Sequence, residues 1–143
     1  MVIKYLRMMK ADIDKLPLIM QGERDCLAVR TSVVVNEIAE VERNIDVFLD
    51  SDGLFVHLAQ GISLTIPPKS NIPAFLFKSK RGLTCYGICS KTLEKNEHLM
   101  FIEDSKTHAM IVPRYGMHIR DYEKYLQETR PLWEVQDDDR NQS

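Results

Sequence analysis

The chain has 143 residues, 44% of them hydrophobic and 28% charged, which suits one domain with a core of its own and excludes a disordered chain. Its formal net charge of −2 at pH 7 excludes a general basic field, so a contact with nucleic acid or an anionic membrane would need a local patch. The chain has only three cysteines and no apolar signal sequence, which predicts a cytoplasmic protein. It has no run of about 18 apolar residues, so no membrane-spanning helix is expected.

Two stripes of apolar residues in the first third of the chain predict helices. Residues 2–16 carry apolar side chains at alternating spacings of four and three, which predicts a helix that ends at Pro17. The same spacing recurs over residues 34–48, after Thr31 or Ser32 as a candidate N-cap. Each stripe spans about two heptads, so a core-facing side is the more frequent role and a coiled-coil contact is the alternative. The candidate oligomer contact is the first stripe, formed by Val2, Leu6, Met9, Ile13 and Leu16.

Short apolar runs separated by turn residues predict strands beyond Gly53. Asp52 and Gly53 stand between two apolar runs, a pattern that is typical of a hairpin. The connections between later runs are short and polar, which favours an antiparallel meander, and Pro67-Pro68 indicates a corner or a sheet edge. The six predicted strands cover residues 54–58, 62–66, 73–77, 83–89, 99–103 and 108–112.

The segment that ends at Pro131 predicts a helix with a single apolar face. That face consists of Ile119, Tyr122 and Leu126 and is expected to pack on the sheet. Trp133 follows the helix and is expected to fold back onto the sheet.

The predicted fold class is α+β, as a single domain over residues 1–136. It combines one or two N-terminal helices, a curved antiparallel sheet of five to six strands and a C-terminal helix packed on the sheet. Residues 137–143 are acidic and polar and are predicted to be a disordered tail.

The sequence carries no readable catalytic, metal-binding or cofactor-binding motif, so no residue is assigned to these roles and no cofactor is expected. Cys85 and Cys89 are four apart on a predicted strand and therefore about 13 Å from each other, too far for a disulfide or a shared ion. For an enzyme without a readable motif, the candidate acid or base is His57, His108 or His118.

One segment of the chain is locally basic. The segment from Lys69 to Lys95 contains six basic residues and a single acidic residue, Glu94. Such residues on a loop can hold a phosphate, a lipid head group or a nucleic-acid backbone, although a basic hairpin tip also protects a sheet from edge pairing, which is the more frequent role. The candidate anion or partner contact is Lys78, Lys80 and Arg81.

Three segments between residues 52 and 133 follow one another in an order that resembles a known family. They are residues 53–56 (GLFV), 62–72 (ISLTIPPKSNI) and 111–114 (IVPR), the last leading into the final helix. Their order is similar to that of the bacterial pleckstrin-homology-like domain at the C-terminus of the YcxB-like family. Members commonly have two transmembrane helices before this domain, where this chain is amphipathic and charged. The resemblance implies a fold and assigns no functional residue, because the family has no well-defined catalytic site.

These observations predict a non-enzymatic binding or interaction module. A protein partner or self-association is the first expectation, and an anionic surface is a further candidate through residues 78–81. One alternative is a small enzyme that uses a histidine as acid or base, and another is a small immunity or anti-host protein that neutralises a partner. A concave pocket in which a histidine meets a carboxylate would favour an enzyme, whereas a flat apolar or single-sign patch would favour a binding module.

Overall fold

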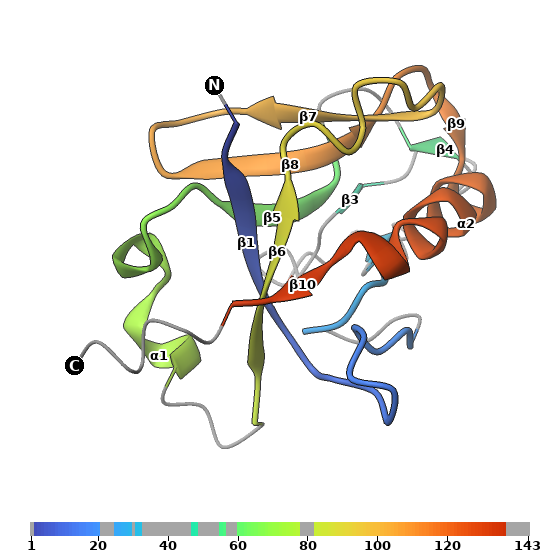
Figure 1. Ribbon diagram of the computed structural model, residues 1–143. Coiled ribbons are helices and arrows are strands. Elements are labelled where there is room, and N and C mark those ends of the chain that lie inside the picture. Colours follow the sequence, from blue (N-terminus) through green and yellow to red (C-terminus); the bar gives the residue numbers. More distant parts are fainter. Residues whose placement is uncertain are drawn as a thin grey trace.

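A six-stranded antiparallel sheet forms the centre of the fold (Figure 1). Its strand order is β10-β6-β1-β5-β8-β7. The strands are β1 (Lys4–Met9), β5 (Ile62–Thr65), β6 (Thr84–Cys89), β7 (Leu99–Glu103), β8 (His108–Pro113) and β10 (Glu134–Val135).

The structure is a computed structural model. Several sequence predictions fall outside the residues that it describes. They are the hairpin at Asp52 and Gly53, the helix over 34–48 up to residue 46, His57, the basic segment 78–81 and the disordered tail 137–143. The described residues are 2–20, 25–29, 31–32, 47–48, 55–56, 60–77 and 82–136, with the backbone alone for residues 31, 32, 47, 48 and 55.

Two halves of the sheet meet at a single pair of residues. In one half, all of β1 pairs with β6, and β10 continues the sheet beyond β6. The other half consists of β5, β8 and β7. The halves are joined where Leu6 of β1 lies opposite Thr65 of β5, and Figure 1 shows β1 and β6 running across the direction of β7 and β8. The two halves are thus steeply inclined to each other, and β1 and β5 diverge beyond this pair.

β1 lies in the middle of the sheet, where the sequence predicted a helix over residues 2–16. Tyr5 and Met9 belong to the main core, and Leu6 and Met8 belong to a second buried cluster. A strand that is buried on both faces lacks the alternation of apolar and polar residues, so its apolar positions can match a helical spacing by chance. The helix prediction is wrong for this segment.

α1 (Ala74–Phe77) is a short helix, where the sequence predicted a strand over residues 73–77. Its Leu76 packs against the second buried cluster, whereas Phe75 and Phe77 are exposed. The apolar run suggested a buried strand, but only one of its long side chains is directed into the protein, so this prediction is wrong. The cluster that receives Leu76 consists of Leu6, Met8, Ile72 and Cys85.

Four predicted strands are confirmed within two residues by β5, β6, β7 and β8. Their arrangement is not the predicted meander, because β1 lies between β5 and β6. Within this sheet, β7 and β8 are adjacent both in sequence and in space. The order could not follow from local patterns, since β1 and β6 are separated by more than half of the chain.

Two small sheets lie beside the main sheet. β4 (Phe55–Val56) is a strand within the predicted range 54–58, but it pairs with β9 (Met117–His118) instead of with the main sheet. β2 (Thr31–Ser32) pairs in parallel with β3 (Val47–Phe48). Residues 47–48 are therefore a strand and not the end of a helix.

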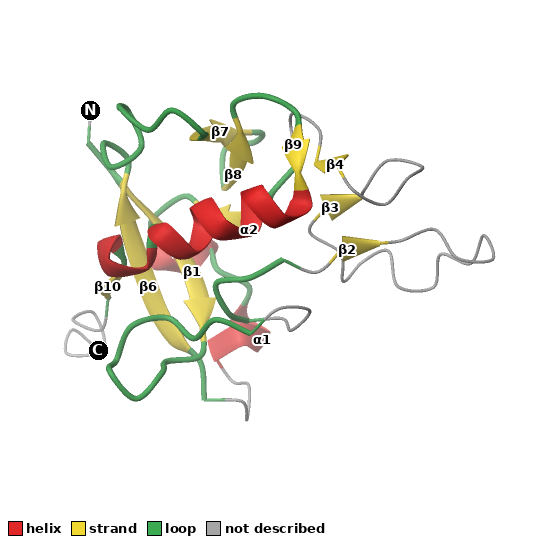
Figure 2. Cartoon of the chain, turned by 90° about the vertical axis from the view of Figure 1, so that its right-hand side faces the viewer, coloured by secondary structure: helices red, strands yellow, loops and turns green. Residues whose placement is uncertain are grey.

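The predicted C-terminal helix is confirmed as α2 (Ile119–Glu128), which crosses one face of the sheet in Figure 2. Tyr122 and Leu126 are fully buried and Ile119 is half-buried against the same core. The Tyr122 hydroxyl donates to the Ile111 carbonyl oxygen at 2.5 Å and accepts from the Ile62 N–H at 3.1 Å, which fixes α2 to β8 and β5.

The chain beyond α2 returns to the sheet, as predicted for Trp133. The indole is buried, and its N–H donates to the Thr129 hydroxyl at 3.0 Å. Thr129 in turn donates to the Leu126 carbonyl oxygen at 2.6 Å, which satisfies a group at the end of α2. Side chains therefore cap the C-terminal end of α2. The chain then continues into β10, which pairs at the edge of the sheet.

We expect Leu126→Ala to lower the free energy of unfolding by about 2–5 kcal/mol, because it leaves a cavity at a fully buried position. Urea denaturation measures the change. The matched control is Leu132→Ala, at a side chain that is 39% exposed, which should cost far less. Equal costs for the two variants would contradict the packing of α2.

Candidate functional site

A cavity of about 210 Å³ lies where β1 and β5 diverge. Its volume corresponds to about seven water molecules, which suits a small organic molecule. Thr65 lies opposite both Leu6 and His108, so these three side chains share one face of the sheet. The apolar part of the wall is formed by Leu6, Met8, Leu64, Ile72, Pro73 and Leu76, and the polar part by Arg7, Asp25, Ser63, Thr65 and His108.

Arg7 connects the two halves of the sheet at this cavity. Its Nη1 donates to the Ser63 carbonyl oxygen of β5 at 2.7 Å, and its Nη2 donates to the Cys26 carbonyl oxygen at 3.1 Å. These bonds hold three segments together at the place where the direct pairing of β1 with β5 has ended. The guanidinium thus has a fixed position in the cavity wall.

The guanidinium of Arg7 keeps hydrogen-bonding capacity beyond these two bonds. It has five N–H donors. The Nε–H is buried without a partner among the described residues, and the two bonds above use one donor on each terminal nitrogen. A further N–H on each terminal nitrogen is therefore available. Arginine in this state is suited to a carboxylate, whose two oxygens match the spacing of its donors.

Asp25 brings a negative charge to the same cavity. Its segment is tied to the end of β1, because the Lys10 N–H donates to the Asp25 carbonyl oxygen at 2.6 Å. A carboxylate has about four lone-pair sites, so it can accept a ligand N–H in addition to partners within the protein. The cavity consequently presents a positive and a negative group beside an apolar wall.

His108 lies at the rim of the cavity and contacts a carboxylate. Its Nδ1 is 2.7 Å from Asp104 Oδ1, across the turn between β7 and β8. When Nδ1 carries the proton, it donates to Asp104, and Nε2 is left as a proton acceptor. Of the two candidate histidines that the structure describes, His108 and His118, His108 therefore has the environment of an acid or base.

The other two described histidines, His98 and His118, have structural contacts. His118 is the N-cap of α2, and its Nδ1 accepts from the Arg120 N–H at 3.0 Å. His98 stacks on Tyr125 with the ring centroids 3.8 Å apart, and its Nδ1 is 2.7 Å from the Tyr115 hydroxyl. These contacts favour a role in holding α2 and the neighbouring loop.

A second cavity, of about 270 Å³, is lined by Tyr5 and Arg114, among others. The Tyr5 hydroxyl donates to Glu103 Oε2 at 2.8 Å, and burial together with this bond raises the pKa of Tyr5 to about 12. Arg114 donates to the carbonyl oxygens of Asn96 and Leu93 at 2.6 and 2.9 Å. The tyrosine stays protonated at neutral pH, and the arginine holds the loop before β7, so both have structural tasks.

The predicted oligomer stripe does not form one surface. Leu6 and Met9 are buried within the chain, Leu16 is half-buried, and Val2 and Ile13 are 52% and 100% exposed. Most of this segment is therefore part of the fold itself, because β1 is a central strand of the sheet. A contact of Val2 and Ile13 with a second copy stays a prediction.

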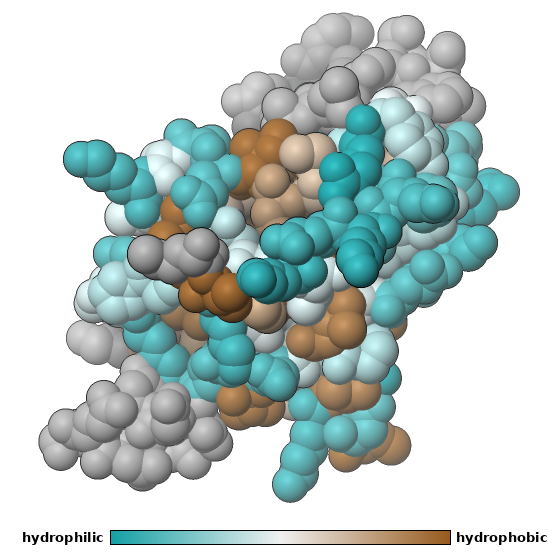
Figure 3. All heavy atoms as spheres, turned by 45° about the horizontal axis from the view of Figure 1, so that its top comes forward, coloured by the Kyte–Doolittle hydropathy of each residue, from teal (hydrophilic) through white to brown (hydrophobic). Residues whose placement is uncertain are grey.

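The side of the described structure that carries β7 and β8 shows no single apolar face. In Figure 3 its apolar side chains form separate patches between hydrophilic ones. Cys85 and Cys89 lie on β6 and form no disulfide, as their predicted strand required, and the buried Cys26 forms none either. Among the described residues no three histidine, cysteine or acidic side chains gather in a way that could hold a metal ion.

Comparison with protein-family models, curated proteins and solved structures finds no match to this chain. The resemblance to the YcxB-like family therefore stays a hypothesis. In the described part of the chain, no helix has both the length and the apolar character needed to cross a bilayer.

Proposed function

We propose that the protein is a binding module whose cavity between β1 and β5 holds a small zwitterion with an apolar side chain, the chemistry of a free apolar amino acid. The observation that carries this proposal is the presence of Arg7 and Asp25, two opposite charges, on one cavity with an apolar wall. A carboxylate on the ligand suits the remaining donors of Arg7, and an ammonium group suits Asp25.

The size and the apolar wall support the same class of ligand. About 210 Å³ leaves room for a short aliphatic side chain beside the charged groups. Leu6, Met8 and Leu76 offer that side chain a surface from which water is displaced on binding. Ligands with several negative charges are disfavoured, because one of those charges would lie near the Asp25 carboxylate and be repelled by it.

Catalysis on the bound molecule is the second candidate, and it is favoured by the pair of His108 with Asp104 at the rim. The imidazole can take a proton from a ligand or from water, while the carboxylate stabilises the resulting cation. This candidate uses the same cavity and adds one step to binding.

Calorimetry and thermal unfolding test the proposal with leucine and three fragments of it. We expect leucine to raise the melting temperature, corresponding to about 2.7 kcal/mol at one hundred times its Kd. The corresponding acid lacks the ammonium, the corresponding amine lacks the carboxylate, and glycine lacks the side chain, so each should bind more weakly. Equal shifts for all four compounds, or none at millimolar concentration, would contradict the proposal.

Variants locate the ligand. Leu76→Trp fills the cavity and should abolish binding, whereas Leu132→Trp, at an exposed position outside the cavity lining, should keep it. Asp25→Asn should weaken the binding of leucine but not the binding of the corresponding acid, which has no ammonium group. A chromogenic ester of leucine tests the second candidate, because His108→Ala should then remove turnover and retain binding.

A further inference from the structure

α1 exposes two aromatic side chains on one short helix. Phe75 is 66% exposed and Phe77 is 48% exposed. Between them, Leu76 packs against the buried cluster beneath, and Ile72 just before the helix belongs to that cluster. The helix is thus held by its inner side, and its two rings face outward. Residues two apart on a helix do not share a face, so the two exposed rings lie on either side of the inward-facing Leu76 and give α1 apolar surface on both flanks.

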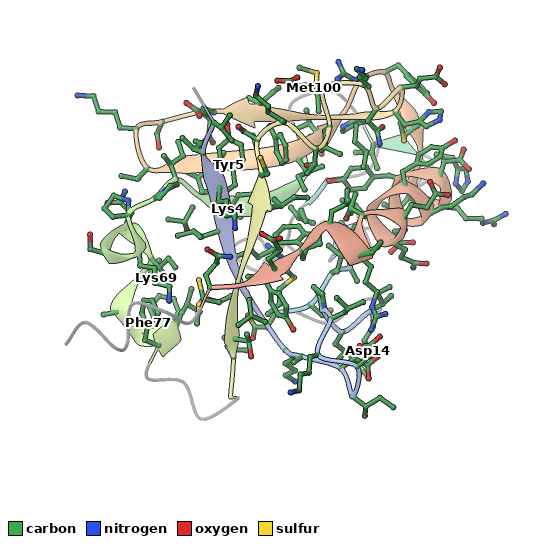
Figure 4. The ribbon with its side chains drawn as sticks, in the orientation of Figure 1. Lys4, Tyr5, Asp14, Lys69, Phe77 and Met100 are labelled. Carbon is green, nitrogen blue, oxygen red and sulfur yellow. The ribbon has the colours of Figure 1, made fainter. Side chains whose placement is uncertain are left out.

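The sequence around α1 carries a net positive charge. Lys69 lies on the 3-10 helix η2 (Lys69–Asn71) just before α1, and Figure 4 labels Lys69 and Phe77 on the same side of the molecule, away from Asp14. Residues 78–81, which follow α1 in the sequence, are Lys-Ser-Lys-Arg, and no acidic residue occurs from Lys69 to Leu93. The sequence therefore combines aromatic and basic residues here, although the whole chain has a net charge of −2.

We propose that α1 docks the protein on an anionic lipid bilayer, with Phe75 and Phe77 in the interfacial region and the charge of the basic residues that are close to α1 in the sequence attracting the head groups. Aromatic side chains favour the boundary between head groups and acyl chains, and basic residues add attraction to anionic lipids. The proposal is independent of the ligand cavity and would stand if the cavity binds nothing.

A bilayer suits these residues better than a nucleic acid does. Single-stranded nucleic acid needs a positive groove that follows several phosphates, together with rings on which bases stack. Here the basic residues are confined to one short stretch of sequence, and the rest of the chain is balanced or acidic. One such short stretch suffices for a flat anionic surface, because binding there requires no extended row of basic residues.

Neither component is strong enough alone. Two phenylalanines insert little apolar surface, and exposed charges are screened over about 8 Å at physiological salt. Stable attachment of peripheral proteins generally takes two signals, so removing either one should reduce binding sharply.

Co-sedimentation with vesicles tests the proposal on the full chain. Vesicles of phosphatidylcholine with phosphatidylserine should bind the protein, vesicles of phosphatidylcholine alone should bind it at least tenfold less, and added salt should weaken the binding. Phe75→Ser with Phe77→Ser should reduce it tenfold or more, as should the triple change of Lys78, Lys80 and Arg81 to Ser. The matched control is Ile13→Ser, at a fully exposed apolar residue that is distant in the sequence from α1 and residues 78–81. This change should leave binding unchanged.

The variants alter exposed or sequence-adjacent positions, so their melting temperatures should equal that of the unmodified protein, and circular dichroism checks this. Binding to neither type of vesicle, equal binding by the double phenylalanine variant, or binding to single-stranded DNA without binding to vesicles would overturn the proposal.

Discussion

Replacing Gly61 with alanine is expected to unfold the protein. A Cβ atom at this position would lie 1.8 Å from the Ile111 carbonyl oxygen and 2.7 Å from the Tyr122 hydroxyl. The first contact is with backbone, which cannot rotate away. Ile111 is held in β8 opposite Ile62, and the Tyr122 hydroxyl bonds to both strands. The clash therefore falls on the point where α2, β5 and β8 meet.

We expect the free energy of unfolding to fall by more than about 4 kcal/mol, a large part of the 5–15 kcal/mol that is typical of a domain. Urea denaturation and the near-ultraviolet circular dichroism spectrum measure the loss. Gly116→Ala is the matched control, because its nearest contact would be the Val56 carbonyl oxygen at 3.9 Å, an ordinary separation. A folded Gly61→Ala protein with an unchanged midpoint would show that β5 and β8 are not arranged in this way.

Deleting residues 1–16 should abolish the cooperative fold. The deletion removes β1, which pairs along its whole length with β6 and joins the two halves of the sheet at Leu6. It also removes Tyr5 and Met9 from the main core and Arg7 from the bridge to β5. Had residues 2–16 formed only the oligomer contact predicted from the sequence, the truncated chain would be expected to remain a folded monomer.

Loss of the near-ultraviolet signal and of a cooperative melting transition would show the effect of the deletion. Ile13→Ser is the control within the same segment, since this side chain is fully exposed and its replacement should leave the transition in place. A truncated chain that melts cooperatively would contradict the central position of β1.

The predictable parts of the fold are those with a local signal. α2 follows from Tyr122 and Leu126 at helical spacing, and β5 follows from Ile62 and Leu64 alternating with polar residues. β7 and β8 are joined by a short polar turn, which is also a local feature. In each case the residues that determine the element lie within about ten positions of one another.

The remaining parts depend on distant residues. β1 is a strand because residues 84–89 pair with it, and no pattern within residues 2–16 contains that information. The exposure of Phe75 and Phe77 was equally hidden, because an apolar run gives no indication of which side chains reach the core. Propensity and spacing therefore fail where long-range pairing decides the structure.

The cavity could not be predicted, since its lining comes from β1, β5, β8, α1 and two connecting segments. One weak signal was present. Arg7 is a lone charge in the apolar run Tyr5-Leu6-Arg7-Met8-Met9, and a charge in a buried strand needs a partner or a task. Asp25 has no comparable signal in the sequence.

The central position of β1 also has a consequence for how the chain is made. Met9, its last residue, is synthesised 80 residues before Cys89, the end of its main partner β6 (89 − 9 = 80). At about 5–20 residues per second, β1 waits roughly 4–16 s for that partner. During this time its apolar side chains are open to chaperones and to other nascent chains, and Lys4 and Arg7 are the charges that oppose aggregation of the segment. The earliest described strand to leave the ribosome thus gains its main partner only after more than half of the chain has been synthesised.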